Sequence, residues 1–177
     1  MPRRHRLVFA ATAALAAVTL TTAGAAPAQA CRHASASPGD VAKEKLRRAV
    51  RCLVNEERAR RALRRLRRNE ALGKAARRHA DDMVERGYFD HERPGSTLRG
   101  RLRDAGWDGA AVAEAIAWGC GSVGTPRAIV DGWLESPPHR EILLGRYNRS
   151  GVGLALGAPY PTDCPGAGTW VLDVGRV

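Results

Sequence analysis

Two histidines and one acid are the residues of this chain best suited to chemistry. His91 ends the segment 88–91, which carries two aromatic residues, and His139 directly follows a Pro-Pro pair. Glu114 is the one charged residue in the apolar run 113–118. Burying an isolated charge is costly, so a carboxylate in such a run must be ion-paired, protonated or metal-bound. Imidazole and carboxylate are also ligands that suit a divalent metal such as zinc.

The spacing of these residues matches no compact metal motif such as H-E-x-x-H, so three separate segments would have to supply the ligands. Two interpretations stay open: a weakly held zinc, or Glu114 bridging His91 and His139 only to hold the segments together. Ser136 lies beside the expected cavity and would allow a Ser–His pair. Serine at a helix end commonly bonds the backbone instead, and no nucleophile-elbow pattern is present, so no catalytic residue is assigned.

Amphipathic helices and short strands are expected to position these side chains. Asp40, Asn69 and Thr125 are suitable N-caps, and Ser96 or Thr97 would cap a third, short helix. These signals and the apolar periodicity predict an α+β chain. The expected helices cover about 40–60, 70–86, 97–105 and 126–136, and the expected strands cover 113–118, 151–156 and 169–174.

His79 lies in the apolar stripe of the expected second helix. Such a histidine is more often a core residue than a ligand. We therefore expect its ring to be buried and to bond a backbone carbonyl.

The first thirty residues have the pattern of a secretory signal peptide. A basic start is followed by an apolar stretch at 7–20, which is too short to span a bilayer, and by Ala28-Gln29-Ala30 as a cleavage site. We expect residues 1–30 to be removed, 31–40 to be a flexible lead-in and 41–177 to be one domain. The exported protein would be extracellular, not transmembrane, and a monomer. Cleavage would leave Cys31 at the N-terminus, where its acylation stays open.

All four cysteines follow the expected cleavage site, at Cys31, Cys52, Cys120 and Cys164. An even number in an oxidising compartment favours two disulfides, for which three pairings are possible. We favour Cys31–Cys52, which would tie the N-terminal segment to the first helix, and Cys120–Cys164, which would tie two loops. Zinc ligation by cysteine is disfavoured because the sequence has no C-x-x-C pair.

The chain is basic, with a formal net charge of +11. Three of the 29 basic residues and none of the 18 acidic ones precede residue 31, so 26 against 18 leaves +8 for the rest. This charge would suit anionic partners such as envelope polymers or lipid. The arginines are spread over helix surfaces among acids, without the basic–aromatic alternation of nucleic-acid sites, so nucleic acid is not an expected partner.

Seven short motifs follow one another over residues 50–175. They are Leu53-Val54-Asn55-Glu56-Glu57-Arg58, Phe89-Asp90-His91, Arg101 with Ala105-Gly106-Trp107, Ala113-Glu114-Ala115-Ile116-Ala117, Trp133-Leu134-Glu135-Ser136-Pro137-Pro138-His139-Arg140, Gly151-Val152-Gly153 and Trp170. Each motif alone is weakly specific, but the seven in this order are strongly specific. The chain thereby resembles the CAP superfamily of cysteine-rich secretory, antigen 5 and pathogenesis-related proteins, in its short bacterial branch.

The resemblance implies an α-β-α sandwich with a small three-stranded antiparallel sheet, and a cavity that holds a divalent metal in several members. Carried over to this chain, the cavity residues are His91, Glu114 and His139. Longer members place a second glutamate where this chain has Ser136, and Glu135 is one residue out of step. The missing acid weakens the case for catalysis more than the case for binding.

Three functional hypotheses follow. The first is a non-enzymatic extracellular binding protein whose partners are apolar ligands, lipid or cell-envelope components. The second is a metal-dependent hydrolase acting on extracellular peptide or cell-wall material. The third is a stable scaffold whose loops bind a partner.

Overall fold

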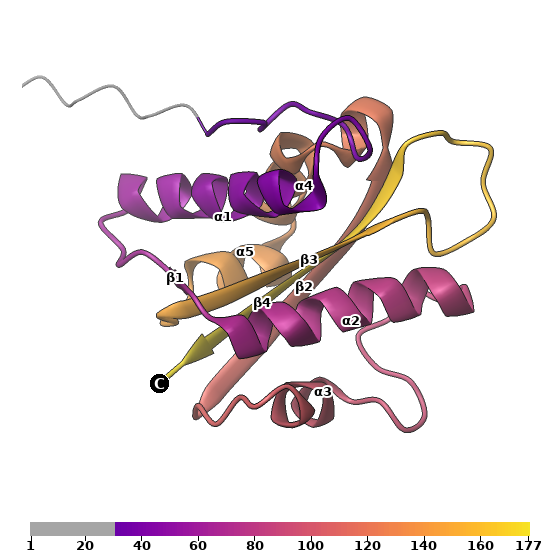
Figure 1. The fold of residues 1–177 in the computed structure, drawn as a ribbon. Helices are drawn as coiled ribbons and strands as arrows, with labels where there is room; N and C mark the ends of the chain where they lie inside the picture. Colours follow the sequence, from indigo (N-terminus) through magenta and orange to yellow (C-terminus); the bar gives the residue numbers. More distant parts are fainter. Residues whose placement is uncertain (1–30) are drawn as a thin grey trace, which may run out of the picture.

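The computed structural model describes residues 31–177, and the expected signal peptide lies outside this part of the chain. The fold is a sheet between two helical layers (Figure 1). On one face lie α1 (Lys43–Arg60), α4 (Pro126–Glu135) and α5 (Pro137–Leu144), and on the other lie α2 (Glu70–Arg86) and α3 (Leu98–Asp104). The α-β-α sandwich and the mixed α/β class agree with the expectation. Within residues 31–177, no helix is both long and apolar enough to cross a membrane.

The sheet has four strands, which corrects the prediction of a purely antiparallel three-stranded sheet. The strands are β1 (Arg67–Arg68), β2 (Ala111–Cys120), β3 (Arg149–Leu156) and β4 (Ala167–Arg176), in the order β1-β3-β4-β2. The two β4 pairings are antiparallel, whereas β1 runs parallel to β3. The β2 strand therefore lies at one edge of the sheet, beside α4 and the segment that follows α2.

The extra strand gave no signal in the sequence because it consists of two exposed arginines without apolar alternation. A side chain from α1 places it. Asn55 donates from Nδ2 to the carbonyl of Leu66 at 3.1 Å and accepts from the amide of Leu66 at 2.7 Å. This pair of bonds holds the chain just before β1 against the body of the protein, and β1 then pairs with β3.

Glycines in β3 allow α2 to lie unusually close to the sheet. A Cβ atom at Gly151 would clash with the backbone of Leu72 and Gly73, and one at Gly153 would clash with the backbone of Ala76. The Gly-Val-Gly motif is thus a requirement for helix–sheet contact. The close contact brings the inner face of α2, including His79, against the middle of the sheet.

Most of the expected helix ends are confirmed. Asn69 accepts from the amide of Leu72, Thr97 caps α3, and Thr125 caps α4. Asp40 was expected to cap the first helix, and this is wrong. Its carboxylate accepts from the amide of Ser37 and closes its own turn, so α1 begins at Lys43.

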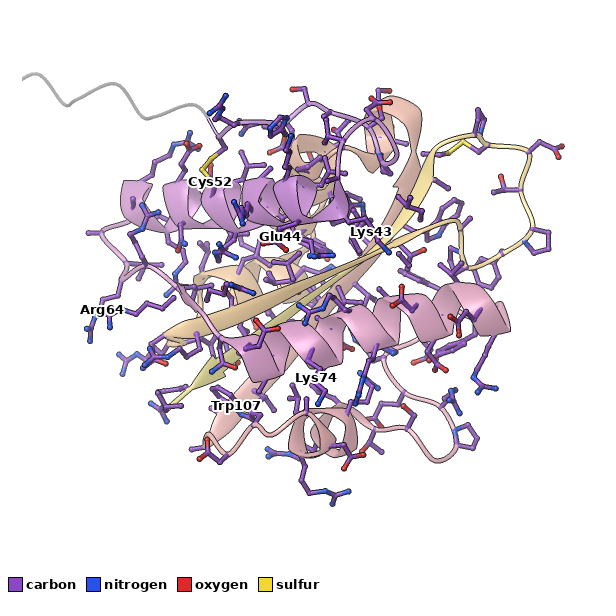
Figure 2. All side chains as sticks on the ribbon, viewed as in Figure 1. Lys43, Glu44, Cys52, Arg64, Lys74 and Trp107 are labelled. Atoms are coloured by element: carbon purple, nitrogen blue, oxygen red, sulfur yellow. A yellow bond between two sulfur atoms is a disulfide. The ribbon has the colours of Figure 1, made fainter. Side chains whose placement is uncertain are left out.

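Two disulfides account for all four cysteines, in the pairing that was favoured. Cys31 bonds Cys52 and ties the segment before α1 to that helix, where Figure 2 shows Cys52 facing the N-terminal side. Cys120 bonds Cys164 and joins the end of β2 to the β3–β4 loop, next to the 3-10 turn η1 (Gly121–Gly124). Because the sulfur of Cys31 is used in a disulfide, it cannot also carry the thioether of a lipid anchor.

Arg58 connects α1 to the segment between α5 and β3. Its side chain is 2% exposed, and its guanidinium has no carboxylate partner among residues 31–177. It donates instead to four backbone carbonyls, those of Arg64, Leu143, Gly145 and Tyr147. The planar, five-donor guanidinium suits this arrangement better than any other side chain.

Candidate functional site

Glu114 is the centre of a buried polar cluster on the α2 face of the sheet. It lies in the middle of β2, and its side chain is 1% exposed. One carboxylate oxygen, Oε1, lies 2.9 Å from His91 Nδ1, and the other, Oε2, accepts from Arg101 Nη2 at 2.8 Å. Burial raises the pKa of the Glu114 carboxyl, but the hydrogen bond from His91 and the surrounding positive charges outweigh burial and lower it. Glu114 is therefore the anion of the cluster.

His91 is presented by the loop that follows α2. Gly87 ends this helix in a left-handed conformation with φ of 68°, and the chain then turns back toward β2. The His91 side chain is 46% exposed, with Nδ1 directed at Glu114. The hydrogen bond to Glu114 raises the pKa of His91 above its ordinary value, against the opposing effect of burial. Since Nδ1 is held by the carboxylate, Nε2 is the ring atom left for a ligand.

Two further side chains complete the shell around Glu114. Arg101 reaches it from α3, and His79 reaches it from α2 with Nε2 at 3.6 Å from Glu114 Oε1. His79 is fully buried, as expected, and a hydrogen bond with the backbone of Asp90 is among the influences on its pKa. Its side-chain neighbours are Glu114 and, at 3.4 Å from Nδ1, the hydroxyl of Tyr88. Burial lowers the pKa of His79, which favours its neutral form.

Asp173 is the member of the cluster that the sequence did not reveal. It lies directly opposite Glu114 in the β2–β4 register and is 1% exposed. Neither of its carboxyl oxygens meets a donor among the described residues. Burial and the neighbouring Glu114 carboxylate raise the pKa of Asp173 well above its ordinary value, which favours the protonated form of this acid. An acid in the otherwise apolar last strand was the signal that could have found it.

His139 approaches from the opposite side of β2, on the first turn of α5. Ser136 lies between α4 and α5, and its hydroxyl is 3.0 Å from His139 Nδ1. A hydrogen bond from this serine to the backbone was expected instead, and this expectation is not met. Burial and then the charge of His91 lower the pKa of His139. The His91 and His139 rings are thus close enough for the charge of one to affect the pKa of the other. Of these two histidines, Glu114 contacts His91 and not His139.

An apolar groove of about 420 Å³ extends from His139 along the edge of the sheet. The β2 edge and α4 form most of its walls. Trp133, on α4, donates from Nε1 to the backbone carbonyl of Ile116 at 3.0 Å, which fixes the helix against this edge. Trp118 and Val123 are 37% and 63% exposed at the groove, large values for apolar side chains. The remaining lining residues are Phe89, Ile116, Ala117, Ala128, Ile129, Gly132, Trp133, Ser136 and His139.

His91, Glu114 and His139 do not form a compact three-ligand metal site in the described part of the chain. His91 and His139 each use Nδ1 in the contacts given above, which leaves Nε2 of each ring for a ligand. Both carboxylate oxygens of Glu114 are already bonded, to His91 and to Arg101. Ligand atoms of His91, Glu114 and His139 do not lie together within 4.8 Å in the described chain. Glu114 would then orient a ligating histidine, as carboxylates behind metal-bound imidazoles do. The one close triad that the described residues contain, Cys31, Cys52 and Glu56, offers no thiolate because the cysteines are bonded to each other.

Comparison with known proteins gives the same assignment as the motifs. The model of the cysteine-rich secretory protein family, CAP, matches residues 52–173. The chain is 32% identical over 141 residues to the protein YkwD of Bacillus subtilis (strain 168), a match that covers 78% of this chain and 53% of YkwD. It is 38% identical over 78 residues to the membrane protein YlbC of the same organism, covering 43% of this chain and 22% of YlbC. The chain thus spans about half or less of these curated relatives.

Solved structures share the fold. An extracellular protein containing an SCP domain from Bacillus anthracis superposes with a TM-score of 0.61 at 26% identity, over 78% of this chain and 45% of that one. An outer surface protein of Borrelia burgdorferi superposes with a TM-score of 0.66 at 20% identity, over 77% of this chain and 96% of that one. From the family match, the identity to YkwD and the shared fold, the chain belongs to the cysteine-rich secretory protein (CAP) family, in its bacterial branch.

Proposed function

We propose that this CAP domain is a non-enzymatic extracellular binding protein that takes an apolar ligand, such as a lipid acyl chain, in the groove beside His139. Its two disulfides suit an oxidising compartment, and a similar solved structure is described as extracellular. The observation that carries the proposal is the exposed apolar surface of Trp118 and Val123 within the groove. Its volume of about 420 Å³ lies in the range of small-molecule sites, roughly 300–1,000 Å³.

A titration with dodecanoate, below the concentration at which it forms micelles, tests the groove. We expect the ligand to change the tryptophan fluorescence of the protein, because Trp118 and Trp133 line the groove. Val123→Asp should weaken binding about tenfold or more, since a charge beside an acyl chain must be desolvated. Val177→Asp makes the same substitution at another exposed valine and should leave binding unchanged. No binding, or equal loss in both variants, would refute the proposal.

We also propose that His91 and His139 bind a divalent metal weakly through their Nε2 atoms. Zinc at this position would supply a Lewis-acidic contact for the polar end of a ligand. The raised pKa of His91 opposes metal binding, because a ligating imidazole must be unprotonated. We therefore expect zinc affinity in calorimetry to rise between pH 6 and about pH 8, and to be lost in His139→Gln but not in His33→Gln. Equal zinc binding by both variants would exclude His91 and His139 as the metal ligands.

A metal-dependent hydrolase acting on extracellular peptide or cell-wall material is the second candidate. The contact of 3.0 Å between Ser136 Oγ and His139 Nδ1 is the observation that favours it, because a nucleophile needs a base within hydrogen-bonding reach. The zinc-loaded protein can be incubated with peptides and cell-wall fragments. Hydrolysis that Ser136→Ala, His91→Ala and His139→Ala each abolish would replace the binding proposal by this one.

A further inference from the structure

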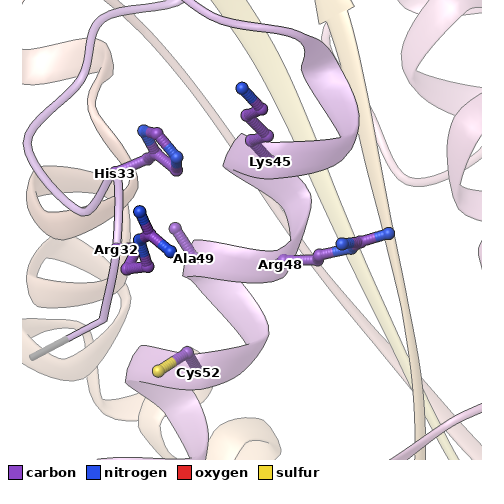
Figure 3. A pocket seen from close by; sticks show the side chains of 6 residues that line it. All are labelled: Arg32, His33, Lys45, Arg48, Ala49 and Cys52. Carbon is purple, nitrogen blue, oxygen red and sulfur yellow. The ribbon is translucent and has the colours of Figure 1, made fainter. Parts of the chain in front are cut away.

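A second concave site, which shares no lining residue with the groove, lies between α1 and the segment that follows Cys31. It has a volume of about 480 Å³. Its lining differs in kind from that of the groove, since four of its six residues carry basic side chains. Figure 3 shows Arg32 and His33 on the segment facing Lys45 and Ala49 of α1, with Arg48 extending to the other side of the helix. Cys52 completes the lining.

Three of the four basic side chains of this pocket have no ion-pair partner among the described residues. Within residues 31–177, the side chains of Arg32, His33 and Lys45 make no ion pair, and none of the six lining residues is acidic. Arg48 points away from these three side chains, and its Nε donates to Glu44 at 3.1 Å. Cations gathered without a counter-charge repel one another, and a bound anion relieves that repulsion.

The pocket is also held in shape by covalent and backbone bonds. The Cys31–Cys52 disulfide fastens the segment to α1, and the amide of Arg127 donates to the carbonyl of Ala34 at 2.8 Å, which fastens it to α4. Between these two points, His33 is held with φ of 63°, a conformation that is uncommon outside glycine. A preorganised site loses less conformational entropy when it binds a ligand.

From these features we propose that this pocket binds a phosphate group carried by a small organic molecule, such as a glycerol phosphate. Guanidinium and ammonium groups are the donors that phosphate prefers, and here they converge from two elements that the disulfide joins. The pocket is larger than a phosphate alone, so the organic part of the ligand lies against Ala49 and the disulfide. A bilayer surface is a poorer fit, because no large apolar side chain lines the pocket in the described chain.

Calorimetry on the exported protein at about 0.15 M salt, with inorganic phosphate and with glycerol 3-phosphate, tests this proposal. For an open site in screening salt we expect dissociation constants on the order of 1 mM, tighter for glycerol 3-phosphate. Arg32→Gln and Lys45→Gln should each weaken binding about fivefold, because each removes one direct charge. Arg99→Gln removes an equal charge from the exposed surface of α3 and should change binding less than twofold.

Three outcomes would overturn the proposal: no binding of either phosphate compound, equal loss in Arg99→Gln, or binding to phosphatidylglycerol vesicles alone. The last would show general attraction of a basic protein to an anionic surface. Arg32 and Lys45 are exposed, so their variants are expected to fold, and unchanged melting temperatures would verify this. Dodecanoate binding in the groove should be unaffected in both variants, which separates this site from the proposed function.

Discussion

Replacing Glu114 by glutamine removes the charge of the buried cluster while nearly preserving its shape. The carboxylate is 1% exposed and is bonded to His91 at 2.9 Å and to Arg101 at 2.8 Å. Breaking a buried ion pair by removing one partner costs about 3–5 kcal/mol. We expect a loss of about 3 kcal/mol in the free energy of unfolding, at the low end, because Asp173 lies opposite and can ionise to replace the lost charge in part.

Urea unfolding followed by tryptophan fluorescence measures this loss. Glu141→Gln is the matched control, since Glu141 is exposed on α5 and pairs with no cation among residues 31–177, so it should cost less than about 0.5 kcal/mol. A loss below about 1 kcal/mol in Glu114→Gln would refute the assignment of Glu114 as the anion that Arg101 and His91 require.

The same variant makes a prediction about pH. Glu114 raises the pKa of folded His91 above its ordinary value of 6.5. The stability from this pair is therefore fully present below the unfolded pKa and is lost as the pH rises through the higher folded pKa. In Glu114→Gln, the His91 pKa measured by NMR should fall, and this component of the pH dependence should disappear. An unchanged His91 pKa would show that the 2.9 Å contact with Glu114 does not cause the raised pKa of His91.

Two predictions concern the scaffold. Arg58→Met should lower the free energy of unfolding by about 4 kcal/mol in urea, because four backbone carbonyls, one of them buried and three partly buried, lose a charged donor. Arg61→Met, at an exposed ion pair, should cost less than about 1 kcal/mol. Similar losses in the two variants would show that Arg58 acts only through its bulk. Thiol titration of the denatured protein should detect no free thiol, and the intact mass should begin at Cys31 without a diacylglyceryl group. Finding the lipid would mean that the Cys31–Cys52 bond does not form.

Local patterns in the sequence determined the helices and the centre of the site. Caps such as Asn69 and Thr125 are visible because a polar side chain must satisfy the free amides at a helix start. Glu114 was identifiable because a charge within an apolar run cannot be left unpaired. The predicted signal peptide implied an oxidising compartment, which made the cysteines interpretable as disulfides.

Only the tertiary structure decided which groups meet Glu114. Asp173 faces it because β2 and β4 pair in one particular register, and no local pattern encodes a register between strands that lie about 60 residues apart. Arg101 and His79 reach the same carboxylate from α3 and α2, and α2 lies this close to the sheet because Gly151 and Gly153 leave room for its backbone. The sequence shows which side chains need partners, and packing decides which partners they find.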